Sequence, residues 1–381
     1  MNSFEVGTYV QQKSGYIAFV PHPFPPSEAM QFPNALQSMH TKAVHSLGKL
    51  DGVADRLPDR DWFLMMFSLR DASSSSQIEG TNATMLDVIE RQNIEPRPDL
   101  PSDVDDIIHY IEALDYGTRL AGDLPFSLRF IRELHKILMS SARATQFSYP
   151  GEFRSSQNWI GGTRPDNARF VPPPVAEMER SLHDLELFFH AEDEYPVLIK
   201  AGLIHAQFET IHPFTDGNGR TGRMLITMFL WEKRLLSTPI LYLSSFFKKN
   251  QQLYYERLDG YHQGKVIEWL DFFLEGVVDS ADSAIQTCIS IADLRDRDMQ
   301  KALSLGKTSA KSTMLVLENL YKMPIIGIAD IVNWTGFSNR GGYNAINRLV
   351  DLEILHPMKA GESVYAQKWI YRDYITLFSD D

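Results

Sequence analysis

The sequence predicts a mainly α-helical protein of several domains, and two observations support that prediction. From about residue 35 onward, apolar residues recur at intervals of three and four over most of the chain, which is the helical period. The chain of 381 residues, with 44% apolar and 23% charged residues, has the composition of a globular protein large enough for two or three domains. Stretches without the helical period are short and rich in glycine, proline or aromatic residues.

The charge, the cysteine content and the lack of long apolar segments limit the partners and the compartment expected for this protein. A net charge of -12 argues against a surface built to coat nucleic acid. Cys288 is the single cysteine, so no intramolecular disulfide can form, which fits a reducing compartment. The first residues lack the pattern of a secretory signal, and the longest apolar run, residues 224–231, is too short to span a bilayer. We therefore expect a cytoplasmic protein with no membrane association.

The N-terminal part divides into an arm and a helical region. Residues 1–34 are rich in proline and aromatic residues and predict an extended arm. Residues 35–120 predict helices, one of which ends at Gly80, since glycine suits the left-handed position after a helix. Thr84 is the expected N-cap of the next helix, and the proline-rich residues 93–103 predict a loop.

The central region, residues 121–277, predicts a helical core interrupted by a flap. The flap, residues 149–174, has no helical stripe and predicts a short hairpin, with strands 156–160 and 168–172 around a Gly-Gly turn. The helix expected over residues 220–236 is apolar on almost every face and should therefore lie in the middle of the core.

The C-terminal part predicts a connector and a separate small domain. A charged connector helix is expected over 278–307, followed over 308–381 by helix, short helix, turn, helix and hairpin. That is the order of a winged helix-turn-helix, with residues 339–349 as recognition helix and 358–368 as wing. Seven basic and eight acidic side chains in this domain give little support for tight contact with a DNA backbone. DNA binding and protein contact, including homodimer formation, both remain open.

Polar chemistry is concentrated in the segment "HPFTDGNGRTGR", immediately before that apolar helix. Glycines free the backbone to turn its N–H groups toward one point, and amides at a helix N-terminus favour anions; these glycines are Gly217, Gly219 and Gly222. Arg220 and Arg223 add planar donor groups suited to phosphate oxygens.

The same segment supplies oxygen ligands and a base. Asp216 and Asn218 carry oxygens, and a carboxylate beside bound phosphates suits Mg²⁺. His212 can accept a proton near neutral pH. The segment therefore predicts a polyphosphate cradle with a metal ligand and a base. The alternative is a glycine-rich helix start, with capping Asp and Asn and solvated Arg side chains.

These residues resemble the Fic domain family, because the segment fits the signature HxFx(D/E)GNGRxxR at every defined position. The resemblance extends over roughly residues 35–275. It implies transfer of AMP from ATP to a Ser, Thr or Tyr hydroxyl of a target protein, with His212 as general base and Asp216 as Mg²⁺ ligand. It further implies phosphate contacts to the α- and β-phosphates from Asn218 and the amides of Gly217 and Gly219, and to the β- and γ-phosphates from Arg220 and Arg223.

The segment "SSSSQIEG" is similar to the inhibitory motif of that family, (S/T)xxxE(G/N). Ser75 and Glu79 are four residues apart and share one helix face. The resemblance implies that Glu79 pairs with Arg223 and blocks the γ-phosphate seat, within an inhibitory segment of residues 75–80. An ordinary helix end with solvated serines is the other interpretation.

The flap and one tyrosine complete the implied ATP site. The family resemblance places residues 158–161 over the nucleotide, namely Asn158, Trp159, Ile160 and Gly161, with Ile160 or Trp159 as clamp. An extended segment of the target would pair with this flap by β-addition. Tyr254 is expected in the adenine pocket. A surface hairpin with an incidental tryptophan, and a core tyrosine, are the alternatives.

Two other functions remain open from the sequence. The same fold would serve AMP removal or transfer of another phosphate-containing group, since Glu79 near the γ-phosphate seat could orient a water. A nucleotide-sensing, DNA-binding regulator is the alternative of another class.

Overall fold

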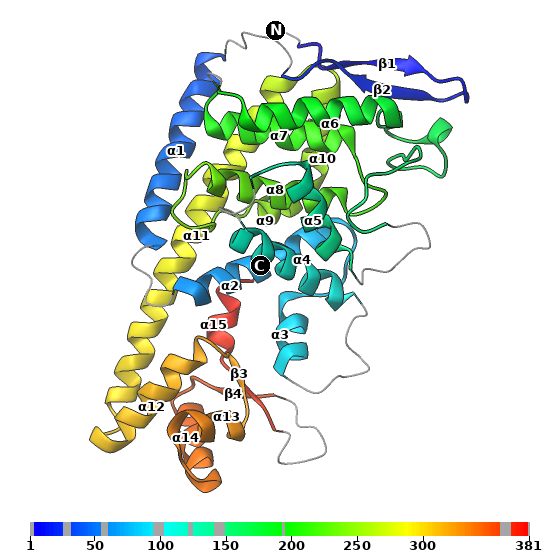
Figure 1. The fold of residues 1–381 in the computed structure, drawn as a ribbon. Coiled ribbons are helices and arrows are strands. Elements are labelled where there is room, and N and C mark those ends of the chain that lie inside the picture. The colour runs from blue at the N-terminus through cyan, green and yellow to red at the C-terminus, as the bar shows by residue number, and fades with distance from the viewer. Residues whose placement is uncertain are drawn as a thin grey trace. The chain divides into compact units, whose positions relative to one another are not determined.

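The computed structural model describes most of the chain, in two compact units (Figure 1). The described residues are 4–25, 32–54, 60–93, 103–120, 125–140, 149–192, 195–358 and 367–379. The first unit comprises residues 1–52, 71–82 and 105–282, and the second comprises 53–70, 83–104 and 283–381. None of the described helices has the length and the apolar character needed to cross a membrane.

The N-terminal arm is a β-hairpin, which the sequence interpretation missed. β1 (Gly7–Gln11) pairs antiparallel with β2 (Ile17–Pro21), and Gly15 takes a positive φ of 95° in the turn between them. Phe19 is fully buried, and its N–H donates to the Val171 carbonyl of the flap at 2.9 Å. The hairpin therefore extends the flap region rather than trailing as a free arm.

Helices make up most of the rest of the first unit, apart from the flap and the loops. Their bounds are α1 (Asn34–Ala54), α2 (Arg60–Ile78), α4 (Val104–Leu120), α5 (Leu128–Leu138), α6 (Val175–His190), α7 (Val197–Ile211), α8 (Asn218–Glu232), α9 (Ser244–Lys249), α10 (Gln251–His262) and α11 (Val266–Leu303). Part of α2 and of α11, the last two residues of α1 and the first residue of α4 belong to the second unit. The mainly α-helical fold is confirmed.

Helix α8 forms the centre of this unit, between α7 and α5 (Figure 1). Twelve of its fifteen residues are buried, which fits the expectation of an apolar central helix. It begins at Asn218 and ends at Glu232, earlier at both ends than the expected range of 220–236. The reason is backbone conformation, because Gly217 before it and Arg234 after it both take positive φ.

The expected end of one helix at Gly80 and the expected N-cap of the next helix at Thr84 are both confirmed. Gly80 follows α2 with a φ of 91°. Thr84 caps α3 (Met85–Asn93): its Oγ1 accepts from the Asp87 N–H at 3.3 Å, and Asp87 Oδ2 accepts from the Thr84 N–H at 2.7 Å. This reciprocal pair satisfies two backbone donors at once.

The flap contains no strand of a regular ladder, so the expected strands 156–160 and 168–172 are wrong. A single antiparallel bridge joins Ile160 and Phe170. Gly161 and Gly162 both take positive φ, and a 3₁₀ turn, η1 (Pro165–Asn167), follows them. Since this wide turn and the prolines after Val171 separate the two sides, no further ladder pairs form.

The second unit combines short helices with a small sheet. Its elements after α11 are α12 (Lys307–Leu320), β3 (Ile325–Ile326), α13 (Ile328–Thr335), α14 (Asn339–Asp351), β4 (His356–Pro357), β5 (Trp369–Ile370) and α15 (Arg372–Thr376). The strand order is β3-β5-β4, all antiparallel. Most of the expected wing, residues 359–366, and most of the expected loop, residues 94–102, lie outside the described residues. The winged-helix interpretation therefore stays a prediction, and the expected connector 278–307 continues a helix that already begins at Val266.

Candidate active site

The polar segment forms the connection between α7 and α8. His212 ends α7 in the left-handed conformation, with φ 48°, and its N–H donates to the Phe208 carbonyl. Gly217 precedes α8 with φ 75°, so the loop runs over residues 212–217 and Gly219, Arg220 and Arg223 belong to the helix. The first turn of α8, where helix amides have no carbonyl partner within the helix, therefore lies at the end of this loop.

Arg154 of the flap holds the start of the loop. Its Nε donates to the His212 carbonyl at 3.0 Å, and its backbone N–H donates to the Pro213 carbonyl at 2.9 Å. Its Nη2 donates to the Pro173 carbonyl at 2.5 Å and to the Ile211 carbonyl at 3.5 Å. Burial lowers the pKa of Arg154 to about 10. Because this value is still well above neutral pH, the side chain remains a cation.

Two asparagines fix the loop around Phe214. Asn158 Nδ2 donates to the carbonyls of His212 and Phe214, at 3.1 and 2.9 Å. Asn218 accepts from the Phe214 N–H and donates to the Phe214 carbonyl, both at 2.8 Å. Both side chains therefore brace the loop from within the protein, and in this arrangement the Asn218 amide is committed to Phe214.

His135 of α5, which the sequence did not single out, supports the other side of the loop. Its ring stacks on Phe214, with centroids 3.6 Å apart. The Gly151 N–H donates to Nδ1 at 2.9 Å, so the ring proton is on Nε2, which donates to the Asp216 carbonyl at 3.0 Å. Burial lowers the pKa of His135 to about 4, which keeps this neutral form at neutral pH.

A cavity of about 430 Å³ opens beside the loop in the first unit. Of the residues singled out from the sequence, those lining it are Glu79, Trp159, Ile160, Gly161, His212, Gly219, Arg223 and Tyr254. Those outside its lining are Ser75, Asn158, Asp216, Gly217, Asn218, Arg220 and Gly222. Glu209, Arg169, Phe170, Tyr255, Leu258, Asp259 and His262, which the sequence did not suggest, complete the wall.

Arg223 is held on the cavity wall by the end of α2. Its Nη2 donates to Glu79 Oε1 and to the Ser75 carbonyl, at 2.8 and 2.9 Å, and its Nε donates to Ser75 Oγ at 2.9 Å. Burial by itself would lower the pKa of Arg223, but the adjacent Glu79 carboxylate raises it above its ordinary value. Glu79 also fills the space over Gly219, where a Cβ would overlap its Oε1.

Asp216 and Arg220 stand apart from this ion pair. Asp216 Oδ1 accepts from the Gly217 N–H at 2.6 Å, and the Asp216 side chain is 57% exposed. Arg220 is nearly buried, with Nη1 3.7 Å from Asp106 Oδ1 and Nη2 3.9 Å from Asp216 Oδ1. In the part of the chain that the structure describes, Arg220 Nε makes no hydrogen bond although it is buried.

Tyr254 is tied to α7 and α8 through a buried histidine. His205 Nδ1 lies 3.0 Å from the Gly222 carbonyl and therefore carries the proton, so that Nε2 accepts from the Tyr254 hydroxyl at 2.8 Å. Burial lowers the pKa of His205 to about 3 and raises that of Tyr254 well above 10. Tyr254 is thus both part of the core and part of the cavity wall, and its expected place in an adenine pocket stays a prediction.

Glu209 is the main residue that the sequence interpretation missed. It lies on α7 one turn before His212, with Oε2 3.8 Å from His212 Nδ1. Burial raises the pKa of Glu209 to about 8, opposed by Arg223 and reinforced by Glu79. Burial lowers the pKa of His212 to about 4, opposed by the Glu79 charge, so the imidazole is neutral and able to accept a proton at neutral pH. A charged residue in the apolar run before His212 was the available signal.

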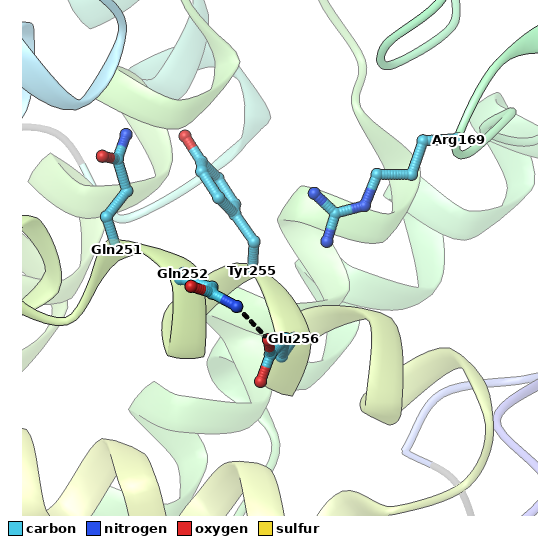
Figure 2. A pocket seen from close by; sticks show the side chains of 5 residues that line it. All are labelled: Arg169, Gln251, Gln252, Tyr255 and Glu256. Carbon is cyan, nitrogen blue, oxygen red and sulfur yellow. Dashed lines mark hydrogen bonds between the residues drawn. The ribbon is translucent and has the colours of Figure 1, made fainter.

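A shallower hollow adjoins this cavity and shares Arg169 and Tyr255 with it. Figure 2 shows that its other side chains come from α10, with Gln251 beside Tyr255 and Gln252 bonded to Glu256. Arg169 approaches from the flap and forms an ion pair with Asp259 at 2.5 Å. The cavity mouth is therefore bordered by exposed polar side chains.

Comparison with known proteins agrees with the signature. Residues 125–230 match the Fic/DOC family, and residues 37–119 match the Fic/DOC family N-terminal region. A probable protein adenylyltransferase of Aquifex aeolicus is 31% identical over 121 residues, covering 32% of this chain and 34% of the relative. Protein adenylyltransferase Fic of Drosophila yakuba is 25% identical over 250 residues, covering 63% of this chain and 46% of the relative. The chain thus spans between about a third and a half of these two relatives.

Solved structures share the fold. A Fic family protein from Desulfovibrio desulfuricans superposes with a TM-score of 0.56 at 18% identity, covering 91% of this chain and 98% of that protein. Fic-1 from C. elegans superposes with a TM-score of 0.51 at 18% identity, covering 68% of this chain and 74% of the other. At these identities the likeness concerns the fold.

Proposed function

Since the chain belongs to the Fic/DOC family, we propose that it is a protein adenylyltransferase, which transfers AMP from ATP to a hydroxyl group of a target protein. One observation carries the proposal: His212, Gly219 and Arg223 line a single cavity at the N-terminus of α8. Its volume of about 430 Å³ lies in the range of small-ligand sites. A neutral imidazole, a helix N-terminus and a cation in one cavity suit a reaction of phosphate anions.

The chemistry assigned to His212 is proton removal. The imidazole accepts the proton of the target hydroxyl while the hydroxyl oxygen attacks the α-phosphorus of ATP. The bond from that phosphorus to the oxygen bridging to the β-phosphate breaks in line, and pyrophosphate leaves with the electron pair. The braces on the His212 carbonyl from Arg154 and Asn158 hold the base in place before substrate arrives.

Mg²⁺ fits this site only together with the nucleotide. Within the described residues, no group of three or more His, Cys, Asp or Glu side chains could hold a metal by itself. Asp216, exposed at the end of the loop, offers a single carboxylate, which suits an ion that keeps water and phosphate oxygens as its other ligands. When bound, Mg²⁺ would neutralise phosphate charge.

We assign Glu79 as an intramolecular brake. Arg223 donates hydrogen bonds from Nε and Nη2 to Ser75 and Glu79, and Glu79 occupies the space over Gly219. A guanidinium paired in this way cannot also hold the γ-phosphate, and the carboxylate would repel it. Release of Glu79 would therefore both open the phosphate seat and free its cation.

We assign the flap as the surface that binds the extended segment of the target protein. Trp159 is 39% exposed beside the cavity, and Ile160 is bridged to Phe170 on one side of the flap. An extended segment pairing with the flap backbone would bring a hydroxyl side chain over the cavity mouth.

Labelling with ATP that carries ³²P on the α-phosphate tests the proposal, using purified protein with Mg²⁺ and a cell lysate. Wild type should label weakly and Glu79→Gly strongly. Adding His212→Ala to Glu79→Gly should reduce labelling by about 10²-fold or more, the usual contribution of a general base. Glu152→Gly is the matched control, because Glu152 also pairs with an arginine but lies outside the cavity lining. No labelling by Glu79→Gly, with ATP still bound, would contradict AMP transfer.

A further inference from the structure

Glu209 and His212 face each other on one turn of α7 with polar atoms left unpaired. Glu209 Oε2 lies 3.8 Å from His212 Nδ1, and their side chains are only 11% and 18% exposed. Among the described residues, Glu209 Oε1 and His212 Nδ1 are both buried without a hydrogen-bond partner. Buried polar atoms without partners destabilise the folded state. Two such atoms beside a proposed base indicate that this pair has a role in the reaction.

The backbone of α8 leaves room for this carboxyl group. A Cβ at Gly222 would lie 2.5 Å from Glu209 Oε1, so any larger residue there would displace Glu209. Gly219 makes the same kind of room for the Glu79 carboxylate. Two glycines of the polar segment thus each admit a carboxyl group against α8, one belonging to the proposed brake and the other next to the proposed base.

A neutral imidazole has one ring proton, and its position decides whether His212 can act. If the proton is on Nε2, that nitrogen donates and cannot accept the proton of a hydroxyl. If the proton is on Nδ1, Nε2 is the acceptor. We propose that Glu209 is a positioning residue for the AMP transfer proposed above: its carboxylate accepts the His212 Nδ1–H and so keeps Nε2 as the base.

The proton balance of this arrangement is simple. As Nε2 accepts the hydroxyl proton, His212 becomes an imidazolium, and the Glu209 carboxylate beside Nδ1 stabilises that charge without taking a proton itself. A closure of less than about 1 Å brings the pair from 3.8 Å to hydrogen-bond distance.

The charged and titratable groups around Glu209 connect it with the brake. Arg223 on α8 favours the ionised carboxyl, Glu79 after α2 disfavours it, and the His212 imidazole on α7 and the Tyr254 phenol on α10 complete the surroundings. Burial is the main cause that raises the Glu209 pKa to about 8, and the Glu79 charge adds to it. Departure of Glu79 removes a like charge and leaves Arg223 uncompensated, so the Glu209 pKa falls, which favours the carboxylate that positioning requires.

The first test reads the tautomer directly. In ¹⁵N-histidine-labelled Glu79→Gly protein, long-range ¹H–¹⁵N spectra should show His212 protonated on Nδ1, with the resonance assigned by its loss in His212→Ala. Adding Glu209→Gln keeps the shape but replaces the charge and can turn an N–H toward Nδ1, so a measurable fraction should move to the Nε2–H form. Glu232→Gln, the same change at the far end of α8, should leave the spectrum unchanged. An Nε2–H form in the parent, or no change with Glu209→Gln, would overturn the proposal.

The second test uses kinetics in the same Glu79→Gly background. Glu209→Gln should lower kcat for AMP transfer by about 10²-fold or more, while KM for ATP stays within about twofold, because Glu209 positions the base and does not bind phosphate. Glu209→Asp retains a carboxylate and should recover part of the loss. An equal loss in the Asp and Gln variants, or a rise in KM alone, would indicate packing instead. If no variant transfers AMP, the proposed function fails, yet the tautomer measurement still decides the role of Glu209.

Discussion

The loop of residues 212–217 and the flap tip, residues 159–169, border the same cavity, but they are held in contrasting ways. Loop carbonyls accept hydrogen bonds from Arg154, Asn158 and His135, which come from other segments. The flap tip is held across its width by the Ile160–Phe170 bridge and within itself by Asn167, whose Oδ1 accepts from the N–H groups of residues 163 and 164. Most of the tip is exposed, whereas the loop's Phe214 is fully buried.

The contrast teaches how one cavity can combine a fixed base with an adaptable rim. A base and a phosphate seat work best when positioned before substrate binds, because reorganisation then costs little. A surface that receives a protein segment benefits from backbone groups that a partner can pair with.

Replacing Arg154 should break the loop most severely. Arg154→Met leaves the carbonyls of Ile211 and Pro173 without this donor and the His212 carbonyl with Asn158 alone, and each buried unsatisfied group costs about 1–3 kcal/mol. We expect the free energy of unfolding to fall by about 4 kcal/mol, partly offset because a buried cation is removed, as measured by urea denaturation. Arg164→Met, on the exposed flap tip, should stay within about 0.5 kcal/mol. Equal losses in both variants would remove the contrast.

Acidification should weaken the support of the loop through His135. Its folded pKa of about 4 lies below the ordinary 6.5, so the unfolded state binds more protons and stability is lost as pH falls from about 6.5 to about 4. At about 1.4 kcal/mol per pKa unit, His135 alone contributes about 3 kcal/mol of that loss. His135→Gln should therefore reduce the pH slope of the unfolding free energy by up to one proton, with pH 8 as the baseline. An unchanged slope would show that His135 is protonated when folded.

A side chain at Gly162 should loosen the flap tip alone. Gly162 has φ 71°, and a Cβ there would lie 2.5 Å from the Asn167 carbonyl oxygen. Gly162→Ala should cost about 1–2 kcal/mol locally, seen as faster amide hydrogen exchange over residues 159–169 with unchanged exchange in the loop. Gly15→Ala is the control, since Gly15 has positive φ but open space around it. Faster exchange in the loop as well would mean that loop and tip move together.

The ion pair between Arg169 and Asp259 should matter least. Its side chains are 47% and 39% exposed, and exposed pairs contribute less than about 1 kcal/mol. Asp259→Asn should lower the unfolding free energy by about 0.5 kcal/mol at low salt and by less at 1 M salt, where screening is strong. A loss above about 2 kcal/mol, independent of salt, would show that the flap tip is anchored more firmly than its exposure indicates.

Some features of the site could be predicted from the sequence and others could not. The polar segment, the apolar helix behind it and the helix ends at Gly80 and Thr84 follow from local rules, since glycine, caps and periodicity act within a few residues. The flap strands and the bounds of α8 were wrong, because the positive φ of Gly161, Gly162 and Gly217 sets both and a sequence does not report φ.

Of the contacts between residues far apart in the chain, one was suggested by the family resemblance and the others were not predicted. The sequence suggested that Glu79 meets Arg223 only through a family resemblance, and 144 positions separate the two side chains that lie 2.8 Å apart. His135 under Phe214 and Arg154 on the His212 carbonyl had no signal of their own, because each depends on how α5 and the flap pack against the loop.

The sequence by itself determined the helical class and the chemistry available in one short segment, since these depend on composition and on spacing along the chain. Only the tertiary structure decided what each polar group does. It committed Asn218 to Phe214, placed Glu79 in the space over Gly219 and brought Glu209 beside His212 in a buried setting. The physical reason is that the ionisation and hydrogen bonding of a side chain depend on burial and on neighbours, which the fold brings together from remote parts of the chain.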